Sequence, residues 1–309
     1  MIKTALLFAG QGAQVVGMGK DLAENSPAAT AWFDRANAAL GYDLASICFN
    51  GPELELTKTE HAQPGIFLVS WVAFELLKER VPGMAFGATA GLSLGEFTAL
   101  TAAGAMSFDD GLKVVRQRGR FMQEACAATQ GGMAAIIGLD ETATRAVCAE
   151  TGVVLANLNC PGQIVISGPS EKMAPACALA KAKGAVRAVP LSVAGAYHSP
   201  LMASARPELE AELACVTLSP LAVPVIANVT AQPHGSPGAI RARLVEQVTS
   251  PVRWEESMRY LVGQGFTHFI ELGPGRALSG FMKRIHKTAE ILNVEDLASL
   301  ETTAKALAG

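Results

Sequence analysis

The sequence predicts an α/β protein in which helices cover a parallel sheet and a smaller α/β unit is inserted into the chain. Short apolar runs that end at glycine alternate with helical stretches, which is typical of buried strands. Half of the 309 residues are hydrophobic and only 17% are charged, and this chain length is ample for a large core. The predicted large subdomain comprises residues 1–128 and 197–309, and the small one residues 129–196.

Charge and cysteine content narrow the class of protein. A formal net charge of −3 provides no dominating basic field, so nucleic acid is not an expected partner. The six cysteines form no C-x-x-C pair, which indicates reduced thiols and no structural metal site. No signal-peptide pattern and no apolar run of membrane-spanning length is present, so a cytoplasmic protein is expected.

The first predicted strand covers Thr4–Ala9 and opens into the turn Gly10-Gln11-Gly12. This turn is not a dinucleotide loop, because Val15 occupies the place of the third glycine in G-x-G-x-x-G. Its useful property is a free backbone N–H at the end of a strand. Two helices are then expected, within residues 25–47 and over residues 65–80, the second with Pro64 near its start.

The most informative stretch is Gly91-Leu92-Ser93-Leu94-Gly95, which a strand over residues 84–90 precedes and an Ala-rich helical run follows. This is the G-x-S-x-G pattern of a nucleophile elbow, as in α/β-hydrolase folds. The glycines tolerate close approach of neighbouring chain, and the following helix directs its first N–H groups toward a developing oxyanion. The pattern therefore predicts an α/β-hydrolase-like core with Ser93 as a nucleophile.

A helix over residues 108–128 carries Arg116, Arg118 and Arg120. At 100° per residue these side chains fan outward rather than share one face. Arg118 is followed by Gly119, which would leave room for a ligand, although most arginines in such a position are solvated surface residues. Both interpretations stay open from the residues alone.

The following segment reads strand–helix–strand–strand–helix–strand. Strands are expected at residues 133–139, 152–158, 163–168 and 185–191, with helices near 141–150 and 171–183. This β-α-β-β-α-β order is that of a ferredoxin-like unit. It contains no nucleophile, so it is expected to form a lid or wall of a cleft.

The chain then returns through a polar crossing that contains His198, followed by further predicted helices and strands. A helix around 207–214, a strand over 223–228, helices over 240–249 and 258–265, a strand over 267–272 and a final basic helix complete the large subdomain. A seam between two domains is a preferred place for a binding cleft.

A nucleophilic serine needs a general base, and the chain has five histidines. His198 lies at the domain crossing, downstream of Ser93 as in hydrolase-type elbows. Glu96 is interpreted as a helix-dipole and capping group, so a carbonyl would orient the imidazole in a Ser–His dyad. The other four histidines are assigned elsewhere. His61 and His234 are expected in proline-flanked loops, His268 in the core of a strand, and His286 on a basic surface.

Seven motifs in order resemble the malonyl-CoA:acyl carrier protein transacylase family of bacterial type II fatty-acid synthesis. They span Gly10 to Gly275 and read GQGAQ at 10–14, GLSLGE at 91–96, RGRFMQEA at 118–125, ANLNCPGQIVISG at 156–168, GAYHSPLM at 195–202, QVTSPVRW at 247–254 and ELGPG at 271–275. The resemblance implies an acyltransferase that moves a malonyl group from malonyl-CoA to the phosphopantetheine thiol of acyl carrier protein.

Carried over by position, the resemblance implies Ser93 as the acylated nucleophile and His198 as its base and acid. Arg118 would bind the malonyl carboxylate through two parallel charge-assisted hydrogen bonds. The N–H groups of Gln11 and Leu94 would form the oxyanion hole, and the carbonyl of Gln247 would orient the histidine.

The family also implies a monomer without a cofactor or metal and an acidic carrier-protein partner. Candidate basic contacts for that partner are Lys283, Arg284 and Lys287, although such charge runs are commonly just solvated. Leu92 departs from the family, since many members have histidine there. Tyr197 replaces the usual phenylalanine in a malonyl-type pattern. The alternatives are a trans-acting polyketide-type acyltransferase or other Ser–His acyl enzyme, and a non-enzymatic carrier-protein scaffold.

Overall fold

The computed structural model describes residues 3–308, and its larger sheet has five parallel strands in the order β7-β2-β1-β8-β9. Because the strands are parallel, their carboxyl ends meet at one edge, where the loops after β1 and β2 lie together. The strands are β1 (Thr4–Phe8), β2 (Ala88–Gly91), β7 (Val225–Ile226), β8 (His268–Leu272) and β9 (Glu290–Val294).

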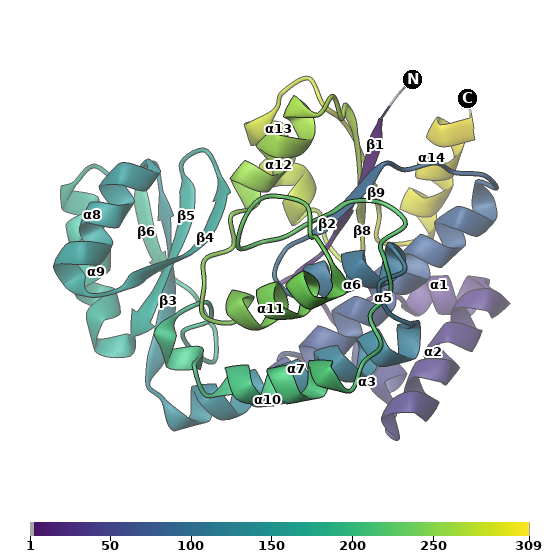
Figure 1. Ribbon diagram of the computed structural model, residues 1–309, viewed down its shortest axis with the longest axis horizontal. Coiled ribbons are helices and arrows are strands. Elements are labelled where there is room, and N and C mark those ends of the chain that lie inside the picture. Colours follow the sequence, from purple (N-terminus) through teal and green to yellow (C-terminus); the bar gives the residue numbers. More distant parts are fainter. Residues whose placement is uncertain (1–2, 309) are drawn as a thin grey trace.

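Helices cover both faces of this sheet, so its strands are apolar on both sides (Figure 1). In β1, Leu6 and Phe8 face the larger core, and Ala5 and Leu7 face a second core formed with α12 (Trp254–Gly263) and α13 (Ala277–Ile285). The remaining helices of the large subdomain are α1 (Lys20–Asn25), α2 (Pro27–Leu40), α3 (Leu44–Asn50), α4 (Glu53–Leu56), α5 (Thr59–Arg80), α6 (Gly95–Ala102), α7 (Phe108–Ala128), α10 (Ala205–Ala214), α11 (Pro237–Gln247) and α14 (Leu297–Ala308), with a 3₁₀ turn at Pro200–Met202.

The smaller sheet has four antiparallel strands in the order β4-β5-β3-β6, packed against two helices at the left of Figure 1. The elements are β3 (Gly131–Ile137), α8 (Glu141–Thr151), β4 (Val154–Cys160), β5 (Gln163–Pro169), α9 (Ser170–Ala182) and β6 (Arg187–Pro190). This is the expected β-α-β-β-α-β order, so the predicted fold class is confirmed. The subdomain boundaries at 129 and 196 stay a prediction.

Two backbone hydrogen bonds join strand β4 of the small subdomain to the large subdomain. The Val252 amide donates to the Ala156 carbonyl (2.8 Å), and the Leu158 amide donates to the Val252 carbonyl (2.9 Å). Strand β4 is thereby attached to the segment that leads into α12. The small subdomain is fixed beside the edge of the large sheet, where it can act as a wall of a cleft.

The sequence predicted some element boundaries wrongly and missed four elements, α1, α4, β9 and α14. Helix α5 begins at Thr59, so Pro64 lies inside it rather than near its start, and His61 lies in its first turns rather than in a loop. Strand β2 is confined to Ala88–Gly91. β9 and α14 were not expected, because the five residues of β9 are recognisable as a strand only through their pairing with β8.

Candidate active site

Ser93 lies on a sharp turn between β2 and α6, and its backbone adopts the left-handed region with φ 53°. A non-glycine residue there is strained, and such strain concentrates at functional sites. The flanking glycines are required by close packing. A Cβ on Gly91 would lie 1.9 Å from the Gly95 carbonyl carbon, and a Cβ on Gly95 would lie 2.2 Å from the Phe8 oxygen.

A Gly95→Ala substitution is therefore expected to destabilise the fold by about 1–3 kcal/mol, because the new Cβ would collide with the backbone oxygens of Phe8 and Ala9, which cannot rotate away. Gly280→Ala is the matched control, since a Cβ there meets nothing within 4 Å in an exposed turn of α13. That control is expected to be neutral or slightly stabilising. Thermal unfolding of both variants is the measurement, and equal midpoints would contradict the packing argument.

Ser93 and His198 form a hydrogen-bonded pair. Ser93 Oγ lies 2.8 Å from His198 Nε2, and His198 Nδ1 lies 2.9 Å from the Gln247 carbonyl oxygen. A carbonyl only accepts, so Nδ1 carries the proton and Nε2 is free to accept the serine proton. His198 also has a positive φ, of 58°. The structure thus places the Gln247 carbonyl at the imidazole, where the sequence predicted it.

The pKa of His198 is lowered from 6.5 to about 4, chiefly by burial and also by the nearby Arg118 cation, while backbone hydrogen bonds with Gln247 and Ser250 act in the opposite direction. The imidazole is consequently neutral at neutral pH. A neutral imidazole that accepts a serine hydroxyl is the form a general base requires.

The pH dependence of acyl loading follows from this shift. The value of kcat/KM is expected to fall on the acid side with a midpoint near pH 4 rather than 6.5, because its pH dependence reports the pKa of the general base in the free enzyme. Since the folded pKa is depressed, the unfolded chain binds the proton first, and stability falls as pH drops from 6.5 toward 4. A loading midpoint near 6.5, with the protein folded throughout, would contradict a buried His198.

Arg118 is buried, with 1% of its surface exposed, so the surface alternative is wrong. Its Nη2 donates to Ser93 Oγ (3.1 Å) and to Gln247 Oε1 (2.9 Å), and its Nη1 donates to Gln63 Oε1 (2.6 Å). Burial lowers its pKa to about 10, which leaves it a cation at neutral pH. A guanidinium therefore lies within hydrogen-bonding distance of the nucleophile.

Gly119 serves a different purpose from the one predicted. A Cβ at Gly119 would lie 2.5 Å from the Thr59 carbonyl oxygen. The absent side chain lets α7 pack closely on the start of α5. It creates no space for a ligand.

The two expected oxyanion donors lie beside Ser93. Leu94 precedes the first turn of α6, and Gln11 is in the turn after β1. Within residues 3–308, neither backbone N–H has a hydrogen-bond acceptor, although of the two residues only Gln11 lines the cavity beside Ser93 and Leu94 is fully buried. The Gln11 side chain is held by Thr59 Oγ1 (3.3 Å) and by the Tyr197 hydroxyl (3.5 Å).

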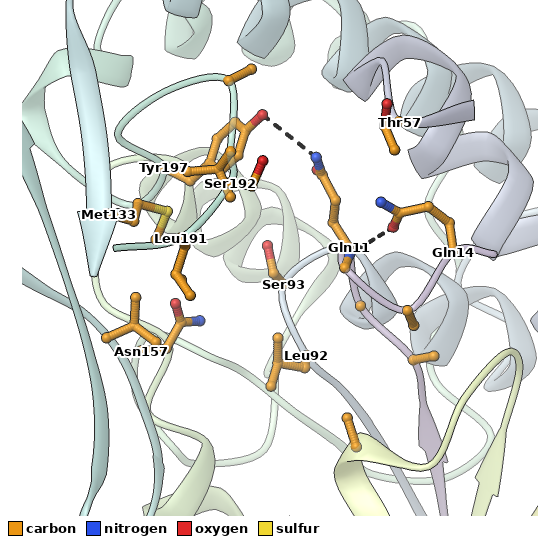
Figure 2. A pocket seen from close by; sticks show the side chains of 18 of the residues that line it. Gln11, Gln14, Thr57, Leu92, Ser93, Met133, Asn157, Leu191, Ser192 and Tyr197 are labelled. Atoms are coloured by element: carbon orange, nitrogen blue, oxygen red, sulfur yellow. Dashed lines mark hydrogen bonds between the residues drawn. The ribbon is translucent and has the colours of Figure 1, made fainter. Parts of the chain in front are cut away.

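The serine opens into a cavity of about 720 Å³ that both subdomains line. Figure 2 shows the Ser93 hydroxyl between Gln11 and Leu92 of the large subdomain and Asn157 and Leu191 of the small one. Arg118 does not line this cavity, but its Nη2 contacts Ser93 Oγ, which does. The cavity volume is in the range of small-molecule and cofactor sites.

The sequence missed a buried cluster beneath the serine. Glu96 is fully buried and accepts a hydrogen bond from His234 Nε2 (2.7 Å), so it is not the capping group that was predicted. His234 lies in a loop, as predicted, but it is buried there, with only 7% of its surface exposed. Asn228 accepts from the Ser93 amide (2.7 Å) and donates to the Gly91 carbonyl (2.8 Å). No pattern in the sequence links residues more than a hundred positions apart, so only the fold reveals these contacts.

Other site types find little support in the described part of the chain. No group of three or more His, Cys, Asp or Glu side chains that could hold a metal occurs in residues 3–308. The cysteines there are free thiols, five buried and Cys215 exposed. None of the helices described is both long and apolar enough to cross a bilayer.

A serine with a neutral imidazole base, free backbone donors and a buried cation defines a site for acyl transfer, and comparison with known families agrees. A model described as "Acyl transferase domain" matches residues 5–305. The chain belongs to this family and is an acyltransferase, which confirms the resemblance found in the sequence and excludes the non-enzymatic scaffold.

Individual proteins similar to this chain carry a more specific name than the family model does. The chain is 46% identical to the malonyl CoA-acyl carrier protein transacylase of Bacillus subtilis, over 99% of this chain and 98% of the relative. It is 43% identical to the Escherichia coli K12 protein of the same name, over 93% and 94%. The solved structure of the transacylase from Coxiella burnetii superposes with a TM-score of 0.96 at 37% identity, covering 100% of this chain and 98% of that one.

Proposed function

We propose that this chain transfers the malonyl group of malonyl-CoA to the phosphopantetheine thiol of acyl carrier protein, through a malonyl ester of Ser93. The observation that supports this proposal most directly is the pair of side chains in contact with Ser93 Oγ. Ser93 Oγ lies 2.8 Å from His198 Nε2 and 3.1 Å from Arg118 Nη2. A base and a carboxylate-binding cation thus meet at one nucleophile, and the relatives named malonyl CoA-acyl carrier protein transacylase support the same substrate.

In the first half-reaction, Ser93 Oγ attacks the thioester carbonyl while His198 Nε2 takes its proton. The N–H groups of Gln11 and Leu94 stabilise the oxyanion, a contribution on the order of 10²–10³ in rate for each such donor. The C–S bond then breaks, and the imidazolium returns its proton to the leaving CoA sulfur. The imidazolium is stabilised by the Gln247 carbonyl.

The second half-reaction reverses these roles. His198 takes the proton of the carrier's thiol, the sulfur attacks the malonyl ester, and the proton passes to Ser93 Oγ as the C–O bond breaks. The reaction needs no cofactor. Arg118 binds the free carboxylate of the acyl group in both halves, and the wall formed by the small subdomain (residues 129–196) limits access of water to the ester.

The acceptor distinguishes the two remaining functions. One relative, 42% identical over 91% of this chain but only 24% of its own length, is the polyketide biosynthesis protein ThaF of Burkholderia thailandensis. A solved complex of a type II polyketide acyl-carrier protein with its malonyl-transacylase matches with a TM-score of 0.95 at 39% identity, covering 98% of this chain. We propose a fatty-acid carrier as the acceptor, with polyketide carriers as the second candidate.

A cytoplasmic location, a monomeric state and basic contacts to the carrier belong to the same proposal. Lys283 and Lys287 are exposed and free to meet an acidic partner. Arg284 instead donates to Gln163 Oε1 (3.3 Å) and to the Pro161 carbonyl oxygen, so it bridges α13 to the small subdomain.

The test is a transfer assay with purified protein, malonyl-CoA and phosphopantetheinylated carriers of the fatty-acid and polyketide types. Intact mass should show a malonyl adduct on the enzyme and then on the fatty-acid carrier. Acetyl-CoA is the matched donor without a carboxylate. A preferred acetyl adduct would favour a different Ser–His acyl enzyme, and transfer only to the polyketide carrier would favour the second candidate.

A further inference from the structure

A buried polar cluster behind the proposed catalytic residues is not used in the mechanism above. It consists of Glu96, Asn228, His234 and the side-chain amide of Gln247, and we call it the Glu96 cluster. Glu96 is 0% exposed. Its Oε1 lies 2.7 Å from His234 Nε2, and its Oε2 accepts from Gln247 Nε2 (2.6 Å) and from the Asn228 amide (3.3 Å). Neither Glu96 nor His234 lines the cavity.

The chemistry of these neighbours fixes the orientation of the Gln247 amide. Its Nε2 faces three oxygens that only accept, those of the Glu96 carboxylate (2.6 Å), the Ser93 carbonyl (3.0 Å) and the Asn228 side chain (3.4 Å). Its Oε1 faces Arg118 Nη2 (2.9 Å), which only donates. If the amide were reversed, its oxygen would face three acceptors and its nitrogen would face a cation.

The same arrangement keeps the cation free for substrate. The direct side-chain partners of Arg118 are neutral, namely Gln63, Gln247 and Ser93. The charge of Glu96 acts across the Gln247 amide and raises the pKa of Arg118 against the larger effect of burial. A carboxylate bonded directly to Nη2 would compete with the carboxylate of an incoming acyl group.

We propose that Glu96 and His234 are positioning residues for acyl-group selectivity, which hold the Gln247 amide so that it directs Arg118 Nη2 toward Ser93 Oγ. The proposal rests on the proposed function, because it assigns Arg118 to the acyl carboxylate. Gln247 links the two halves of the site, since its side chain orients Arg118 while its main-chain oxygen holds His198. Loss of the Glu96–His234 hydrogen bond is expected to weaken recognition of the malonyl group more than it slows attack by Ser93.

His234 supplies one hydrogen bond to this arrangement. Its Nε2 must donate, because a carboxylate only accepts, and its Nδ1 has no partner among residues 3–308. His234→Gln preserves an N–H donor near the position of Nε2, whereas His234→Leu removes it. The two variants therefore separate the hydrogen bond from the volume of the side chain.

The experiment measures kcat and KM for malonyl and acetyl loading in the full chain, with thermal unfolding alongside. In Glu96→Gln the new amide can also donate, so the Gln247 amide can reverse, and the malonyl-to-acetyl ratio of kcat/KM should fall about ten- to a hundred-fold. The fall should lie mainly in KM for malonyl-CoA. His234→Leu should reduce the ratio in the same direction, and His234→Gln should restore it.

Two further variants complete the design. His268→Leu is the matched control, because His268 begins β8 at the opposite end of the sheet and, within residues 3–308, its side chain bonds only to Thr267 Oγ1 (2.9 Å). Glu96→Gln combined with Arg118→Ala should lose no more selectivity than Arg118→Ala alone, since both act through one guanidinium.

The outcomes separate the two proposals. If the wild type shows no malonyl preference, or if Arg118→Ala leaves it unchanged, the proposed function fails. If the wild type prefers malonyl and Arg118→Ala removes that preference, while Glu96→Gln and His234→Leu keep the wild-type ratio, only the positioning role is wrong. Equal losses of malonyl and acetyl loading in a folded variant would also overturn it. Should Glu96→Gln not fold, the comparison of His234→Leu with His234→Gln decides the question.

Discussion

Ser93→Ala is expected to abolish the acyl-enzyme adduct and to reduce transfer on the order of 10⁶-fold, as removal of a catalytic serine does in serine hydrolases. The physical reason is that no other nucleophile occupies the elbow. Ser93 Oγ is the atom in contact with His198 Nε2, and alanine removes the atom that would carry the acyl group. Intact mass after incubation with malonyl-CoA measures the adduct directly.

Ser219→Ala is the control for this experiment, because Ser219 is exposed in the loop after α10. It should load malonyl as the wild type does. A malonyl adduct of undiminished amount in folded Ser93→Ala protein would show that another residue is the acceptor, and the mechanism proposed above would be wrong.

Arg118→Ala is expected to reduce malonyl loading by about 10²- to 10³-fold while acetyl loading changes much less. The guanidinium is buried and donates to Ser93 Oγ at 3.1 Å, so a malonyl carboxylate at the ester would lose its charged partner in a site with little water. Acetyl carries no carboxylate and loses no such partner. Steady-state loading with both CoA thioesters gives the ratio.

Arg120→Ala tests whether the effect is specific to the buried guanidinium. Arg120 lies on the same helix, is exposed and bonds to Gln117 Oε1 (3.1 Å), so its removal should leave both loading rates unchanged. Arg118→Lys should recover little malonyl loading, because an ammonium cannot reproduce the planar pair of donors. Equal losses for malonyl and acetyl in Arg118→Ala would contradict a role in carboxylate recognition.

The fold class was predictable because its signals are local. Apolar runs such as residues 4–8 form parallel strands that are buried on both faces. The β-α-β-β-α-β order of residues 131–190 is recognisable because the spacing of apolar residues changes between strands and helices. Boundaries were less predictable where a neighbour decides them. The strand expected over residues 84–90 narrows to Ala88–Gly91, since only those residues pair with β1.

The candidate site was predictable to the extent that a resemblance identified residues by position. Ser93 has a local signature, because the two glycines beside it are imposed by contacts within a few ångströms of the turn. His198, Arg118, Gln11, Leu94 and Gln247 have no such signature, and the helical pattern of α7 did not distinguish Arg118 from its exposed neighbours. Glu96 was misinterpreted because its place in the first turn of α6 suggested capping, whereas its partner His234 lies 138 residues away.

The sequence by itself determined most of the order of strands and helices, the turn that exposes Ser93 and the family to which the chain belongs. Tertiary structure alone decided that Arg118 is buried rather than solvated, and that a carboxylate and a second histidine lie beneath Ser93 and His198. The physical reason is range. Backbone propensity and steric crowding act between residues close in the chain, whereas burial and hydrogen bonding depend on which distant segments the folded sheet brings to one edge.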